Sequence, residues 1–461
     1  MKIGLLPLAR ATFDVDFANE NLRAMLSELD QSGHEFTGSR DLLFDADATN
    51  AALSDLASQP IDCVLVLQVT FTDAVAIVDI ANTLEAPLSI WAIPEPRLGG
   101  RLRLNSFCGL NLASHALGLN GISFGWSYCA PDKMTDAEFS LLLGTSNRAP
   151  APQAVSSSNS ASARAQSTAA SLAGKRIGRI GAHPDGFDTC AYDTNKLDAL
   201  AGVAVDELEL DDLFETARAL PDDAAETVLE TAKAQLSGLD AVDQTELDRS
   251  ARLKVALDEL RSGGNYDAFA IRCWPETFTE YGGAVCGPVS MLGEARTPCA
   301  CEADVYGALT QLVLQQVADA PVFLTDLVDI DVDDNSGVIW HCGQAPISMR
   351  DPDVEPAATI HTNRKMPLLF EFPLKPGRVT LMRMSQAKGQ TAMVIATGEM
   401  LKRPMAFTGT SGVIRFDAPA SETLDRVIES RLEHHMAVCY GDHRAALLDV
   451  AAALDLPVVE I

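Results

Sequence analysis

Five side chains that could bind a metal or transfer protons occur in the second half of the chain, each beside an apolar run. They are Glu302 in ACEADVYGALT, Asp326 in PVFLTDLVDID, His341 in VIWHCG, and the neighbours His434 and His435 in RLEHHMAVCYGD. Two carboxylates and up to three imidazoles are enough to hold a divalent cation and to move protons. The pattern is typical of an enzyme whose strand and helix ends position these groups at a cleft.

The local sequence predicts the element that positions each of the first three residues. The run from Ala300 through Thr310 predicts a helix with Glu302 in its first turn, where the helix dipole alone would also favour an acidic residue. Asp326 follows PVFLT, so we expect it at the carboxyl end of an apolar strand, where open α/β sheets place ligand-binding groups. His341 ends a β run before a glycine turn, and a structural histidine is the alternative.

His434 and His435 are adjacent, so on an extended segment we expect them to point to opposite sides. At most one would then bind a metal, and the other would contact substrate or pack at a domain interface. A mixed carboxylate and imidazole set with no thiolate pair favours a hard divalent cation over structural zinc. Mn²⁺ is the first choice.

Other candidate contacts are less specific. The turn GAHPDGFD carries Phe187, which could line a pocket or belong to an ordinary turn. Trp274 in RCWPE could offer an apolar face to a sugar ring or pack in the core. Arg97, Arg101 and Arg103 lie together in an otherwise acidic chain, so they could bind a sulfonate, phosphate or carboxylate, or form surface salt bridges.

Composition excludes several classes of function. The net charge of -29, from 64 acidic and 35 basic residues, would repel nucleic acid and anionic membranes. No run of about 18 apolar residues occurs, and the start MKIGLLPLAR lacks a cleavage-site pattern. The ten cysteines lie mostly in apolar segments, as reduced thiols do. We therefore expect a cytoplasmic protein with no nucleic-acid or membrane partner.

The pattern of apolar runs divides the 461 residues into three expected domains and a linker. Residues 1–145 and 175–345 alternate short apolar strands with helices, which predicts two doubly wound, Rossmann-like α/β domains. Residues 146–174 are rich in Ser, Ala and Pro, which predicts a mobile linker. Residues 346–461 predict a β-rich C-terminal domain that carries the terminal histidine ligand.

The segments ACEADVYGALT, FLTDLVDID and WHCGQAP, together with the HH-containing segment, resemble the L-fucose isomerase and L-arabinose isomerase superfamily. IDCVLVLQVTFTDA and RLGGRLRLNSFCGLN are similar to its fucose isomerase-related group. The resemblance implies that Glu302 and Asp326 are both metal ligands and the catalytic acid/base pair, with His435 as the third ligand. It also implies that His434 contacts substrate, and His341 is similar to a fourth ligand of the arabinose branch.

The implied activity is a metal-dependent aldose–ketose isomerase that acts on a sugar through an ene-diol proton transfer. By the same resemblance the protein would be a homo-oligomer, a hexamer, with sites between subunits. One alternative is an isomerase of an anionic sugar such as sulfoquinovose. A second alternative, from another class, is a non-catalytic sugar-binding or sensor protein.

Overall fold

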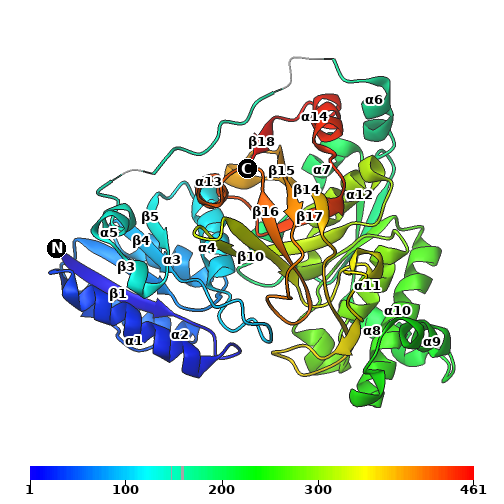
Figure 1. The fold of residues 1–461 in the computed structure, drawn as a ribbon, viewed down its shortest axis with the longest axis horizontal. Helices are drawn as coiled ribbons and strands as arrows, with labels where there is room; N and C mark the ends of the chain where they lie inside the picture. Colours follow the sequence, from blue (N-terminus) through cyan, green and yellow to red (C-terminus); the bar gives the residue numbers. More distant parts are fainter. Residues whose placement is uncertain (147, 157–159) are drawn as a thin grey trace.

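The N-terminal region is a parallel sheet covered by helices on both faces (Figure 1). The computed structural model describes residues 1–146, 148–156 and 160–461. The five strands, in the order β2-β1-β3-β4-β5, are β1 (Lys2–Leu8), β2 (Glu35–Gly38), β3 (Cys63–Gln68), β4 (Leu88–Ala92) and β5 (Phe124–Tyr128). The helices are α1 (Val15–Gln31), α2 (Ala46–Ala57), α3 (Val75–Thr83), α4 (Ser106–Leu119) and α5 (Asp136–Leu142).

The mostly apolar character of β1, β3 and β4 follows from burial on both sheet faces. All six residues of β3 are buried. Leu65 packs in a core with α1, whereas Val64 and Val66 pack in a core with α2, α3 and α4. The predicted parallel α/β arrangement of this region is confirmed.

A second, four-stranded parallel sheet follows, in the order β7-β6-β8-β9. Its strands are β6 (Arg176–Ile180), β7 (Ala204–Leu208), β8 (Ala268–Ile271) and β9 (Cys299–Ala300). Its helices are α7 (Thr194–Ala201), α8 (Leu210–Ala219), α9 (Glu226–Gln235), α10 (Gln244–Gly264), α11 (Cys286–Glu294) and α12 (Val305–Ala318). Glu302 lies between the end of β9 and the start of α12.

The third sheet has nine strands and is mostly antiparallel, in the order β12-β13-β16-β11-β10-β17-β14-β15-β18. The strands are β10 (Phe323–Asp331), β11 (Ser336–His341), β12 (Ala357–Thr359), β13 (Leu369–Pro373), β14 (Gly377–Ser385), β15 (Ala392–Met400), β16 (Thr410–Phe416), β17 (His435–Tyr440) and β18 (Val458–Glu460). The helices α13 (Ala420–Glu429) and α14 (Arg444–Ala453) complete this region. The C-terminal region is strand-rich, as predicted.

One expected grouping differs from the structure. The sequence placed residues 323–341 in the second α/β domain, but β10 and β11 lie at the centre of the nine-stranded sheet, beside β17 and β16. An apolar run such as PVFLT suits a parallel or an antiparallel partner equally well, so the sequence did not show which sheet it joins. The domain boundaries themselves stay predictions.

The Ser/Ala/Pro-rich segment at 146–174 contains a helix. Residues 147 and 157–159 lie outside the described part of the chain. Helix α6 (Ala163–Ala170) packs beside α14 (Figure 1), and Ala165 and Leu172 are buried in the core that α12 and α14 share. Residues 163–172 therefore contribute apolar side chains to the core, and the linker at 146–174 stays a prediction. Among the described residues, no helix is long and apolar enough to cross a bilayer.

Candidate active site

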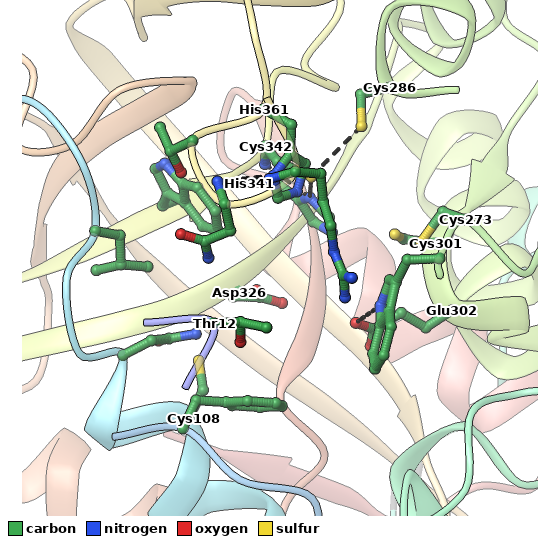
Figure 2. A pocket seen from close by; sticks show the side chains of 18 of the residues that line it. Thr12, Cys108, Cys273, Cys286, Cys301, Glu302, Asp326, His341, Cys342 and His361 are labelled. Atoms are coloured by element: carbon green, nitrogen blue, oxygen red, sulfur yellow. Dashed lines mark hydrogen bonds between the residues drawn. The ribbon is translucent and has the colours of Figure 1, made fainter. Parts of the chain in front are cut away.

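The sequence-predicted carboxylates and imidazoles come together where the four-stranded and nine-stranded sheets meet. Asp326 on β10 is directly opposite His435 on β17, so the two side chains share one face of the sheet. His341 is the last residue of the neighbouring strand β11. Figure 2 shows Glu302, Asp326 and His341 around the same cavity. Asp326 lies within β10 and not at a strand end, so that part of the sequence prediction is wrong.

Glu302 sits on an unusual stretch of backbone. It belongs to the 3-10 turn Cys301–Ala303, with φ 58° and ψ 25°, and Ala303 also has a left-handed φ of 55°. Such conformations cost about 1–3 kcal/mol per residue and are common at functional sites. The prediction that Glu302 lies in the first helical turn is wrong, because Asp304 caps α12 by accepting a hydrogen bond from Gly307 N at 2.8 Å.

The carboxylate of Glu302 is held by two aromatic donors. His434 Nε2 donates to its Oε2 at 3.0 Å, and Trp274 Nε1 donates to its Oε1 at 3.1 Å. Burial raises the pKa of Glu302, but the hydrogen bond and the charge of His434 outweigh burial and lower this pKa. Burial lowers the pKa of His434, and Glu302 raises it above its ordinary value. Each side chain therefore favours the charged form of the other.

His435 is oriented by a buried acid. Its Nδ1 donates to Asp304 Oδ2 at 2.9 Å, and Arg383 Nη2 donates to Asp304 Oδ1 at 3.1 Å. With the ring proton on Nδ1, the lone pair of Nε2 is directed to the cavity side. That nitrogen lies 3.3 Å from Asp326 Oδ1 and 3.8 Å from Glu302 Oε2.

The charges around His435 favour its neutral form. Burial lowers the pKa of His435, and so does the positive charge of His434. Burial raises the pKa of Asp304, but Arg383 and His435 lower it well below its ordinary value. A neutral imidazole beside ionised carboxylates is the form that binds a divalent metal.

The two histidines do not point to opposite sides, as the sequence had suggested. Their ring centroids are 3.9 Å apart, and both approach Glu302. Strand β17 begins only at His435, so the strand alternation on which the expectation rested does not apply to His434.

Several buried donor atoms at this point have no hydrogen-bond partner among the described residues, namely Asp326 Oδ1, His341 Nε2 and His435 Nε2. Their convergence is unfavourable unless a cation or water satisfies them. Two overlapping groups have ligand atoms within 4.8 Å of one another: Asp326, His341 and His435; and Cys190, Glu302, His434 and His435. Carboxylate and imidazole donors of this kind fit a divalent cation.

His341 is the weakest donor of the set. Its Nδ1 accepts a hydrogen bond from Cys342 N at 2.9 Å, which puts the ring proton of the neutral form on Nε2. Burial lowers the pKa of His341, but the charge of Cys342 and its hydrogen bond raise this pKa to about 10. Metal binding through Nε2 would require loss of that proton, which weakens His341 as a ligand relative to His435.

The cavity has a volume of about 120 Å³ and aromatic, basic and thiol walls (Figure 2). Trp274 lines it, as one of the two sequence interpretations proposed. Phe187 does not line the cavity, which corrects its predicted place there. Its side chain is fully buried and packs at 5.4 Å against the ring of Trp274 and at 6.1 Å against that of His434, so it supports the wall from behind.

The arginines that the sequence singled out are held by other groups. Arg97 pairs with Asp329 at 2.6 Å beside a different cavity, and Arg103 pairs with Asp14 at 2.9 Å. Arg101 donates to a side-chain oxygen of Asn363 and to a backbone carbonyl. The salt-bridge interpretation is therefore correct for Arg97 and Arg103.

Sequence reasoning missed the two arginines that line the cavity, Arg10 and Arg364. Arg10 follows the apolar run of β1, and its place near the carboxyl end of a parallel strand was a usable signal. Arg364 lies in the loop between β12 and β13, where no sequence pattern distinguished it. Asp304 and Arg383 were also missed as the residues that orient His435.

Comparisons with known proteins identify the family of this chain. Residues 4–143 match the model described as "Fucose/sulfoquinovose isomerase, N-terminal domain", and residues 339–461 match "L-fucose isomerase, C-terminal domain". A sulfoquinovose isomerase of Alkalicoccus urumqiensis is 32% identical over 99% of this chain and 98% of its own. Another, of Priestia aryabhattai, is 29% identical over 98% of this chain and 97% of its own.

The comparison with solved structures carries no argument about the fold of this chain. A periplasmic solute-binding protein of Actinobacillus succinogenes with bound D-allose covers 69% of this chain at 11% identity, but the TM-score of 0.19 is too low to inform the fold. The fold, the site and the sequence matches define an enzyme of the aldose–ketose isomerase class. The chain belongs to the fucose/sulfoquinovose isomerase family.

Proposed function

We propose that this protein is a metal-dependent aldose–ketose isomerase whose substrate is sulfoquinovose or a close anionic analogue. The observation that carries the metal-dependent mechanism is the convergence of the unpartnered Asp326 Oδ1 and His435 Nε2 beside the ionised Glu302. The choice of substrate rests on the relatives, which are named sulfoquinovose isomerase, and on the two arginines of the cavity.

Glu302, Asp326 and His435 would hold the cation, and His341 is the fourth candidate. We propose Mn²⁺, because the donors are oxygen and imidazole nitrogen. A divalent cation bound there would stabilise the negative charge that develops on the two sugar oxygens.

The carboxylates supply the proton transfers. We assign the carbon-to-carbon transfer to Glu302, which takes the proton from C2 of the aldose and returns it to C1. Its hydrogen bond to His434 keeps it ionised and able to accept that proton. Asp326 carries the second proton, which it takes from the O2 hydroxyl of the aldose and delivers to O1, so that the carboxylate is regenerated when the ketose has formed. Trp274 fixes the orientation of Glu302 through its indole N–H.

Several finer expectations remain part of this proposal. The two parallel sheets would be Rossmann-like domains, His434 would contact the substrate, and the protein would work as a cytoplasmic homo-oligomer, a hexamer by family resemblance. The resemblance of the motifs around Glu302 and Asp326 supports these expectations.

Isotope exchange under controlled metal content tests the proposal. Metal-free protein should be inactive on sulfoquinovose, and added Mn²⁺ should restore turnover. In D₂O the recovered aldose should carry deuterium at C2, because a proton held on a carboxylate exchanges with solvent. Turnover by metal-free protein would reject the metal site. Absence of label over many turnovers, together with an active Glu302→Gln variant, would reject the proton-transfer assignment.

A further inference from the structure

The indole of Trp274 joins two parts of the cavity. Its Nε1 donates to the carboxylate of Glu302 at 3.1 Å. Its ring also lies near two guanidinium groups, with the Cζ of Arg10 at 5.8 Å and that of Arg364 at 5.5 Å from the ring centroid. Both arginines line the same cavity as Glu302 and Asp326. Two positively charged side chains thus lie near the same indole ring that donates a hydrogen bond to the candidate acid/base group.

Arg364 has no carboxylate partner of its own among the described residues. It is half-buried, and the nearby acid Glu276 is already paired with Arg272 at 2.7 Å. Burial lowers the pKa of Arg364, and the positive charge of Arg10 lowers it further. The two positively charged guanidinium groups repel each other, and a bound anion would offset that repulsion.

The loop that carries Arg364 and the side chain of Arg10 are both held in place, so the backbone of this region is preformed. The loop of Arg364 is organised by His361, whose Nδ1 accepts hydrogen bonds from the backbone N–H groups of Asn363 and Arg364, each at 3.2 Å. Arg101 Nε donates to the side-chain oxygen of Asn363 at 2.9 Å, which ties this loop to the N-terminal region. Arg10 is fixed by an ion pair with Asp73. Preorganised donors lose little entropy when they bind an anion.

We propose that Arg364, assisted by Arg10, forms the subsite that binds the terminal sulfonate of the sugar. The inference rests on the proposed function and adds the residues that select the substrate. Arg364 is the main contact, because its charge has no carboxylate partner in the described part of the chain, whereas Asp73 partly compensates the charge of Arg10. An anion on these guanidinium groups places the opposite, carbonyl end of the sugar toward Glu302. A neutral aldose leaves Arg364 without an anionic partner and binds more weakly.

A comparison of two sugars tests this subsite. Sulfoquinovose and 6-deoxy-D-glucose share a carbon chain, but only the first has a terminal sulfonate. Arg364→Gln should raise KM and lower kcat/KM for sulfoquinovose by about 10- to 100-fold, the loss usual for a charge-assisted contact. The values for 6-deoxy-D-glucose should change little. Arg444→Gln, which removes an exposed arginine paired with Glu460, is the matched control and should behave as wild type.

Binding to metal-free protein gives a readout that is independent of turnover. By calorimetry, wild-type protein should bind sulfoquinovose more tightly than 6-deoxy-D-glucose, and Arg364→Gln should remove this preference. An equal loss for both sugars, or a preserved preference in Arg364→Gln, would overturn the subsite and leave the isomerase proposal intact. If wild-type protein binds and turns over only the neutral sugar, the sulfonate substrate and the subsite both fail.

Discussion

Strand β10 carries two buried aspartates that have opposite surroundings. Asp329 accepts hydrogen bonds from Arg97 Nε at 2.6 Å and from the hydroxyl of Tyr128 at 2.5 Å. Asp326, three positions earlier, has an oxygen with no hydrogen-bond partner among the described residues, and His435 Nε2 lies 3.3 Å from that oxygen. Both side chains are at most 12% exposed, so burial does not distinguish them.

The two carboxylates differ in whether the protein itself supplies all their hydrogen-bond partners. Both carboxylate oxygens of Asp329 accept hydrogen bonds from protein side chains. Its ion pair with Arg97 joins β10 to the N-terminal region. One carboxylate oxygen of Asp326 has no hydrogen-bond partner among the described residues, so it needs an ion, a water or a substrate in the cavity. Buried polar atoms without partners are costly, so their convergence at one point indicates a bound ion or substrate. We infer that Asp329 has a structural role, whereas Asp326 has a functional one.

The largest expected effect is a loss of kcat when a proposed acid/base residue is replaced. Asp326→Asn and Glu302→Gln keep the side-chain shape but remove a proton acceptor and a negative ligand. Each should lower kcat by at least the roughly 10²- to 10⁴-fold that is typical of lost acid–base catalysis. Steady-state kinetics with circular dichroism of the same samples measures the loss and verifies the fold. Near wild-type turnover in either variant would contradict the assignment.

The next effect concerns Asp304, which orients His435. Asp304→Asn breaks the fully buried pair with Arg383 and should cost about 3–5 kcal/mol in the free energy of unfolding. The pKa of Asp304 is lower in the fold than the ordinary value of about 3.9, so its stabilisation is full above that value and declines as the pH falls toward the folded-state pKa. Urea unfolding should show the difference from wild type shrinking between pH 6 and pH 3. If the difference in the free energy of unfolding instead grew on acidification, the prediction would be contradicted.

The smallest effect is at Asp329. Asp329→Asn should lower the free energy of unfolding by about 1.5–3 kcal/mol, because Arg97 keeps its hydrogen bonds to Ser336. The kcat per folded molecule should remain near that of wild type. Chemical unfolding and kinetics on the same preparation check both points. A selective loss of kcat in a stable Asp329→Asn protein would remove the distinction between the two aspartates.

The sequence predicted the fold where burial leaves a local signature. The first five residues of β3 are apolar because helices cover both faces of its sheet, and this pattern correctly indicated a parallel arrangement. The residue types beside the apolar runs also pointed to Glu302, Asp326, His341 and the two terminal histidines, which lie close together in the structure. Residue type and position beside apolar runs were sufficient for that step.

What the sequence could not show depends on long-range pairing. The apolar run before Asp326 joins an antiparallel sheet, and nothing local distinguishes this from a parallel strand. The arginine cluster was found from composition, yet Arg97 is paired with Asp329, 232 positions away. Arg364 reaches the cavity only because its loop folds across from the C-terminal region. Such partners are set by tertiary structure.

Titration of metal-free protein with Mn²⁺ in a calorimeter tests the central claim most directly, namely that the unpartnered donors around Asp326 form a cation site. Asp329→Asn should bind Mn²⁺ as wild type does. Asp326→Asn should bind it more weakly by at least the about 10- to 100-fold lost when a supporting residue of a metal site is removed. Equal affinity in wild type and Asp326→Asn would contradict the account.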